Sequence, residues 1–264
     1  EGNLWMVNNQ VDSVIVIRMK DGSWRKLFYA PLEQAPTLAT TLFDRKGRFW
    51  ICSRRTVNYH NGGLMGIDYA GTIETQDDDY SYYRSHITNQ DGTSYKFEGV
   101  QSIAEDHDGR IWVGTDIGLF VIDNPDDWFN DDFRITQVKV PRNDGTNLAD
   151  YLLYGMPIIS ITVDGANRKW IGTSGNGVYL VSASGQDILH HFTSENSPLL
   201  SNNVTNIAIH PRTGEVMMGT DGGLVSYQSD ATSPSETLSE GTIQIFPNPV
   251  RPEYHGNVTI TGLT

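Results

Sequence analysis

The sequence is poor in three features, and each absence excludes a class of protein. Cys52 is the single cysteine among 264 residues, so the chain cannot form an intrachain disulfide, and cystine says nothing about its compartment. No apolar run approaches the roughly 18 residues of a membrane-spanning helix, so we expect no membrane span in this chain. The 19 lysines and arginines are outnumbered by 32 aspartates and glutamates, which gives a formal net charge of −13. Because phosphate backbones are bound by basic patches, we expect no nucleic-acid partner.

Motifs for catalysis and for metal binding are also missing. The seven histidines show no H-x-x-x-H spacing, and no G-x-S-x-G nucleophile elbow occurs. Acidic residues gather at 77–79 and 126–132 without the spacing of a calcium loop, so solvated loops are the favoured interpretation. We therefore expect no catalytic residue, no metal and no cofactor, and a protein that is not an enzyme.

Residues 98–123, EGVQSIAEDHDGRIWVGTDIGLFVID, contain a pattern that recurs along the chain. Three short apolar runs are separated by two turn sequences, one at 106–109 and one at 115–118. Aspartate side chains bond the backbone of such turns, and glycine accepts a positive φ without strain. The pattern predicts a meander of three short strands, which cannot bury its own faces.

The pattern occurs five times. The equivalent large side chain of each copy is Trp5, Trp50, Trp112, Trp170 or Met217, at spacings of 45, 62, 58 and 47 residues. Periods of roughly 40–50 residues, with four strands in each, are typical of propeller blades. The sequence therefore predicts an all-β fold, a β-propeller with about five recognisable four-stranded blades. The first copy lacks its inner strand, so we expect the natural N-terminus to lie upstream.

Three segments are expected along the chain. Propeller blades occupy 1–228, with outer strands predicted at 80–87 in the second blade and 133–140 in the third. Residues 229–241 have the Ser/Thr/Pro-rich composition of a linker. Residues 242–264 show a new strand pattern, which predicts the truncated beginning of a C-terminal β-sandwich domain.

The candidate binding residues lie on one rim of the expected propeller. The large tryptophans are interpreted as structural, because they sit on a middle strand between adjacent blades. The loop between the second and third strands of each blade should emerge on the same rim as the crossing loops between blades. Two adjacent arginines there could hold a carboxylate or phosphate, the alternative being ordinary rim charges. The candidates are Arg54, Arg55, Asp116, Asn176 and Asp221 in these loops, and Tyr151 and Tyr154 in the crossing loop 142–156.

Two sequence features carry a resemblance to known families. The D-x-x-G turn, the W-[IV]-G-T strand and the following hairpin resemble two-component-regulator propeller repeats, as at 106–119, 165–178 and 214–224. The segment NSPLLSNNVTNIAIHPRTGEVMMGTDGGLVSY followed by IQIFPNPVRPEYHGNVTITGL resembles the PorZ-type proteins of Bacteroidetes, which belong to the type IX secretion apparatus. That family has more blades than five, and the C-terminal domain is incomplete here.

The resemblance implies an extracytoplasmic, non-enzymatic binding and scaffold module in the periplasm or at the cell surface. Its partner would be a surface glycan such as lipopolysaccharide, or a protein of the secretion system. An alternative is the periplasmic oligosaccharide-sensing propeller of a hybrid two-component regulator. A third hypothesis, a propeller enzyme, requires titratable residues that converge at the channel mouth, where the sequence places mostly Thr, Asn and Asp.

Overall fold

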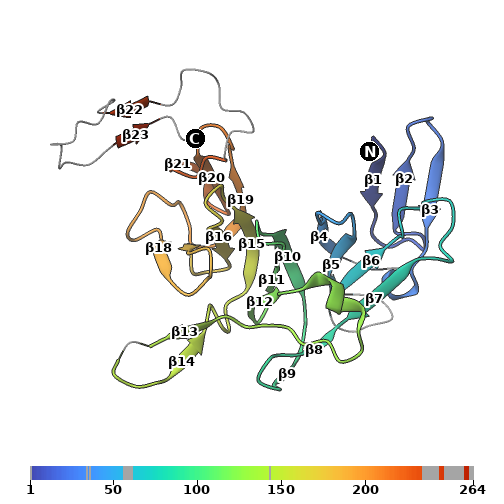
Figure 1. Ribbon diagram of the computed structural model, residues 1–264, viewed down its shortest axis with the longest axis horizontal. Coiled ribbons are helices and arrows are strands. Elements are labelled where there is room, and N and C mark those ends of the chain that lie inside the picture. Colours follow the sequence, from blue (N-terminus) through green and yellow to red (C-terminus); the bar gives the residue numbers. More distant parts are fainter. Residues whose placement is uncertain are drawn as a thin grey trace.

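The computed structural model describes residues 2–33, 35, 37–55, 62–142, 144–233, 244–246 and 259–261. Within these residues the regular structure is almost entirely antiparallel sheet. Five sheets follow one another in chain order and fan out in an arc, with their inner strands β4, β10, β15 and β19 side by side (Figure 1). The all-β propeller arrangement predicted from the repeats is confirmed.

The five sheets are the blades, and their strands run in chain order from the inner edge outward. The first blade has three strands: β1 (Leu4–Val7), β2 (Ile15–Arg18) and β3 (Trp24–Leu27). The second has four: β4 (Thr37–Phe43), β5 (Phe49–Arg55), β6 (Gly63–Asp68) and β7 (Tyr80–Arg84). The third has three: β10 (Val100–Glu105), β11 (Ile111–Thr115) and β12 (Gly118–Ile122). The fourth has four: β15 (Ile158–Val163), β16 (Lys169–Thr173), β17 (Val178–Val181) and β18 (Ile188–Phe192). The fifth has three: β19 (Val204–Ile209), β20 (Glu215–Thr220) and β21 (Gly223–Gln228).

Two small hairpins and two 3-10 helices lie between the blades. The first hairpin pairs β8 (His86–Thr88) with β9 (Ser94–Lys96), and the second pairs β13 (Lys139–Pro141) with β14 (Ala149–Tyr151). The helices are η1 (Ala30–Leu32) and η2 (Pro125–Phe129). Both hairpins project from the same edge of the arc (Figure 1).

The third blade differs from the prediction. The outer strand expected at 133–140 is reduced to a single bridge between Val121 and Thr136. The reason is η2, which inserts the fully buried Trp128 between the second and third blades. Arg84 fixes this turn by donating to the carbonyl oxygen of Trp128 at 2.8 Å. The chain then leaves the sheet after Thr136 and forms the β13–β14 hairpin.

Three repeated tryptophans fill the space between blades, as predicted. Trp50, Trp112 and Trp170 are fully buried. Each indole Nε1 donates to an aspartate six residues earlier, at distances of 3.0, 2.8 and 3.1 Å to Asp44, Asp106 and Asp164. The same aspartates accept backbone amides of the turn between the first two strands of the blade. One carboxylate therefore closes the turn and satisfies the buried indole.

A glycine two residues after the tryptophan lets the next blade approach closely. A Cβ on Gly114 would lie 2.7 Å from Cγ2 of Ile158, and a Cβ on Gly172 would lie 2.5 Å from Cγ1 of Val204. Both partners are the first residue of the next inner strand. Cys52 occupies the corresponding position in the second blade and is fully buried. The W-[IV]-G-T motif thus encodes the contact between blades.

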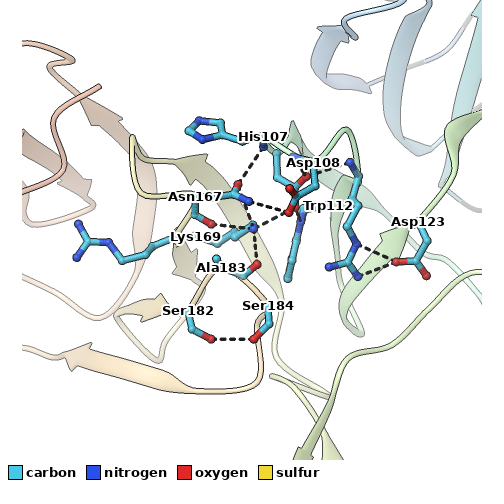
Figure 2. A network of polar contacts seen from close by, with 12 residues as sticks. His107, Asp108, Trp112, Asp123, Asn167, Lys169, Ser182, Ala183 and Ser184 are labelled. Carbon is cyan, nitrogen blue, oxygen red and sulfur yellow. Dashed lines mark hydrogen bonds and ion pairs between the residues drawn. The ribbon is translucent and has the colours of Figure 1, made fainter. Parts of the chain in front are cut away.

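Polar side chains add a second connection between the third and fourth blades (Figure 2). Lys169 Nζ lies 3.0 Å from Asp106 Oδ2 and 4.6 Å from the centre of the Trp112 ring. It also donates to the carbonyl oxygens of Asn167 and Ala183, at 2.8 and 2.7 Å. Lys169 and Asp106 are both almost fully buried, so this ion pair lies inside the interface.

The segment after the fifth blade starts as part of the propeller. Ser233 donates its amide to Pro211, Ala231 is buried, and Asp230 accepts a 2.7 Å ion pair from Arg168. Further on, β22 (Gln244–Phe246) pairs with β23 (Thr259–Thr261). The rest of the predicted linker and sandwich segment lies outside the described residues.

Candidate functional site

The hairpin turns between second and third strands contact the crossing loops, so the two sets of loops share one rim. The Asp116 amide donates to Gly99 at 3.1 Å, the Ser174 amide to Pro157 at 3.0 Å, and the Asp221 amide to Asn203 at 3.1 Å. The same contact therefore recurs in three successive blades.

Two of the predicted rim carboxylates hold these loops together. Asp116 Oδ1 accepts the amide of Gly99 at 2.9 Å. Asp221 Oδ2 accepts the side-chain amide of Asn203 at 3.0 Å. Hydrogen bonds from Ser201 and Asn203 hold the pKa of Asp221 below its ordinary value. Both carboxylates therefore bond a crossing loop, and Asp221 is also exposed to solvent.

Asn176 lies half-buried in the turn between β16 and β17. Its amide donates to Thr173 Oγ1 at 3.1 Å, and its carbonyl accepts from His191 Nε2 at 2.7 Å. The imidazole of His191 stacks on Tyr179 with ring centres 3.9 Å apart. This contact ties the rim turn to the outer strand β18.

Arg54 lines a polar groove along the inner strands, which we call the axial groove. The groove has a volume of about 570 Å³. A β-bulge in each of β10, β15 and β19 adds one residue to the strand, and all three extra residues, Gln101, Ile159 and Thr205, line the groove. Gln101 Oε1 is buried and has no hydrogen-bond partner among the described residues. The groove thus offers hydroxyl and amide groups from four neighbouring blades.

Arg54 is the one charged residue in this lining. It is exposed, and none of the described residues forms an ion pair or hydrogen bond with its guanidinium. Its side-chain stem lies near Gly99, since a Cβ there would be 3.5 Å from Arg54 Cγ. Arg55 pairs with Thr37 through its backbone, and its side chain lies outside the described part of the chain. Arg54 therefore lines the axial groove, whereas Asp116 bonds a crossing loop, although both lie on the rim.

Tyr151 and Tyr154 meet in a second cavity of about 570 Å³, which we call the tyrosine pocket. Their ring centres are 6.2 Å apart. Tyr95, from the β8–β9 hairpin, is 6.4 Å from Tyr154, and Tyr179 of β17 also lines the pocket. Sequence reasoning missed Tyr95 and Tyr179, because only the packing of the two hairpins brings them to this place. The tyrosine pocket and the axial groove share no lining residue.

The described residues contain neither a metal-ligand cluster nor a membrane-spanning helix. In the described residues, no group of three or more His, Cys, Asp or Glu side chains is arranged to hold a metal ion. No helix within the same residues has the length and apolar character needed to cross a bilayer.

Comparison with known proteins shows which proteins the chain resembles. The family described as two component regulator propeller matches residues 94–116. None of the curated proteins gives a significant sequence match. Among solved structures, PorZ of Porphyromonas gingivalis, described as an essential bacterial surface component of the type-IX secretion system, is 29% identical with a TM-score of 0.79. The match covers 99% of this chain and 35% of PorZ, so the chain spans about a third of that protein.

Extracellular domains of regulators from B. thetaiotaomicron share the fold. One, from a putative hybrid two component system, is 21% identical with a TM-score of 0.57. The match covers 87% of this chain and 26% of the regulator chain. Another, from a putative one component system, is 15% identical with a TM-score of 0.56. The match covers 90% of this chain and 27% of that regulator chain. The repeat match at 94–116 and the similarity to PorZ over 99% of this chain show a β-propeller that is similar to part of PorZ.

Proposed function

We propose that the chain is a non-enzymatic, extracytoplasmic binding and scaffold module that docks an anionic surface glycolipid, such as lipopolysaccharide, or a protein of the secretion system. The observation that carries this proposal is the similarity to PorZ, a bacterial surface component, over 99% of the chain. The chain corresponds to 35% of PorZ, so the proposal concerns the function of these blades and not that of a whole PorZ-like protein.

The axial groove supports binding rather than catalysis. General acid–base chemistry needs a carboxylate, histidine or similar group placed at the reacting atoms. Arg54 is the one titratable side chain in the groove lining, and the other polar groups there are hydroxyls and amides. Such groups orient a ligand without exchanging protons with it at neutral pH.

Arg54 gives the groove its preference for anions. A guanidinium holds carboxylate or phosphate groups with two parallel hydrogen bonds. The chain carries a formal net charge of −13, so most of its surface repels anions. An anionic glycolipid would therefore be drawn to Arg54 and to the neutral hydroxyls beside it.

The test is binding of the purified chain to lipopolysaccharide vesicles, with Arg54→Ala compared with Arg134→Ala. Arg134 is an exposed arginine on the third blade outside the groove lining, so its removal changes the net charge equally. We expect Arg54→Ala to weaken binding about tenfold or more, as for loss of a charge-assisted contact. The double variant Arg54→Ala/Arg55→Ala reports whether the second arginine contributes. Equal binding by the two single variants would contradict a site in the groove.

The second candidate, an oligosaccharide-sensing propeller, is favoured by the regulator repeat match at 94–116. The same vesicle experiment tests the glycolipid form of the first candidate. Absence of any lipopolysaccharide binding by the unmodified chain would argue against glycolipid docking and leave docking of a secretion-system protein and the sensor as the two candidates.

A further inference from the structure

The tyrosine pocket is lined by the hairpin that follows the incomplete outer edge of the third blade. Beyond β12 the blade continues only as the bridge between Val121 and Thr136, where the fourth blade has the full strand β18. The chain departs into the β13–β14 hairpin instead. The pocket lies between this hairpin and the β17–β18 part of the fourth blade.

Aromatic and aliphatic side chains form its walls. Tyr154 is 57% exposed and Ile188 is 48% exposed, so both present apolar surface to solvent. Tyr179 is buried on the opposite side, where His191 stacks against it. Tyr151 completes the lining beside Tyr154. The pocket thus has several ring surfaces at one opening.

The hydrogen bonds around Tyr151 fix its ring before any ligand arrives. Its hydroxyl donates to Asp91 Oδ2 at 2.6 Å and accepts from Asn89 Nδ2 at 3.2 Å. Asp91 is held in turn by Lys139 at 2.8 Å. A ring that is already ordered loses little conformational entropy on binding, which favours affinity.

The backbone between the two tyrosines is strained. Leu153 has a φ of 50°, although it is not a glycine. This conformation is unfavourable for a residue with a Cβ and persists where the surroundings impose it, often at binding sites. Here it buries the Leu153 side chain in the core while Tyr154 projects outward.

We propose that the tyrosine pocket binds a pyranose ring of a neutral glycan, with a C–H face of the sugar against Tyr154. The negative face of a tyrosine ring attracts polarised C–H groups, and its hydroxyl edge accepts hydrogen bonds from sugar hydroxyls. The volume of about 570 Å³ lies within the usual range of small-molecule sites.

The charges in the lining of the pocket favour a neutral ligand over an anion. No lysine or arginine lines it, and Asp150 is the one charged lining residue. Its carboxylate is paired with Arg142 through contacts of 2.8 and 2.5 Å. The site does not depend on the proposed glycolipid docking, because that function rests on Arg54 in the separate axial groove.

The experiment titrates the full chain with neutral hexasaccharides of glucose, mannose and galactose, followed by calorimetry. We expect at least one of them to bind. Tyr154→Ala should weaken that binding about tenfold, as for loss of an aromatic anchor. Because Tyr154 is exposed, this variant should fold, which circular dichroism checks.

The matched control is Tyr80→Ala, which removes an exposed tyrosine from the outer strand of the second blade. It should leave saccharide binding unchanged. Tyr151→Phe keeps the ring but removes its hydroxyl bonds, and we expect an intermediate loss. Arg54→Ala should bind the neutral saccharide as well as the unmodified chain. The proposal is overturned if no neutral saccharide binds, or if Tyr154→Ala and Tyr80→Ala bind equally.

Discussion

Lys169 and Asp106 form an ion pair of 3.0 Å that is buried between the fourth and third blades. The position of Lys169 in its blade corresponds to Phe49 and Ile111 in the blades before it, which are apolar. Asp106 already serves the turn and the Trp112 indole. The fourth blade has therefore added a charge at a position where its neighbours rely on apolar packing.

Replacing Lys169 with methionine should be strongly destabilising. The variant keeps the length of the side chain but leaves the Asp106 carboxylate buried without its cation. Removing one partner of a buried pair costs about 3–5 kcal/mol in free energy of unfolding. Urea unfolding followed by tryptophan fluorescence measures this loss. The control is Arg142→Ala, which breaks an exposed pair with Asp150 and should cost under about 1 kcal/mol. A similar loss in both variants would contradict the structural role of the buried pair.

The deficit of Lys169→Met should depend on pH. Burial alone would raise the pKa of Asp106, but hydrogen bonds from Trp112 and Lys169 outweigh it and keep that pKa below its ordinary value. A depressed carboxylate pKa contributes stability above the unfolded pKa of about 4, and this contribution is lost as the pH falls through the folded pKa. In the variant the unpaired carboxylate gains its proton more readily. The difference between variant and unmodified chain should therefore be largest near neutrality and shrink below about pH 4. A difference that stays constant from pH 7 to pH 3 would contradict this assignment.

Gly172→Ala and Gly219→Ala should differ, although both glycines belong to the same motif. A Cβ on Gly172 meets Val204 of the next blade at 2.5 Å, and overpacking of this kind costs about 1–3 kcal/mol. On Gly219 the nearest atom is the rotatable hydroxyl of Thr205 at 2.9 Å, and no described residue of a following blade approaches. We expect a loss under about 0.5 kcal/mol there. Thermal unfolding compares the two; equal losses would show that the interblade contact is not the cause.

Asp116→Ala should affect stability and leave ligand binding intact. The variant removes the acceptor of the Gly99 amide, which costs about 1–2 kcal/mol when the donor is partly shielded. Since this carboxylate is used within the rim, binding of lipopolysaccharide vesicles should be unchanged or slightly stronger. Denaturant unfolding and vesicle binding are measured on the same preparation. A large loss of binding without loss of stability would make Asp116 a ligand contact.

The spacing of tryptophans and glycines was sufficient to predict the blades, because each blade interface uses the same local pattern. The predicted extent of the outer strand at 133–140 was wrong, because the alternation of apolar residues there does not reveal that Trp128 occupies the core nearby. Outer strands make few of the interblade contacts that the repeated sequence pattern specifies, so the pattern does not predict where they end.

The candidate site was predictable only in part. Arg54, Tyr151 and Tyr154 were among the predicted candidates and do line cavities, although Arg54 lies within strand β5 and not in the loop after it. Asp116 and Asp221 looked equally available, but their bonds to the crossing loops depend on segments 17 and 18 residues away. Tyr179 of β17 joins the pocket lining, and Tyr95 of the β8–β9 hairpin contacts Tyr154, through tertiary packing that no local pattern reports.

The contact between a glycine of one blade and a β-branched residue of the next couples only adjacent sheets. Stability then resembles that of a linear array, in which cooperativity passes from neighbour to neighbour and the ends have fewest partners. In the described part of the chain the second, third and fourth blades are each flanked on both sides, whereas the first and fifth are flanked on one. Amide hydrogen exchange should accordingly be slowest in β11 and β16 and fastest in β3 and β21, as a gradient rather than a single global opening.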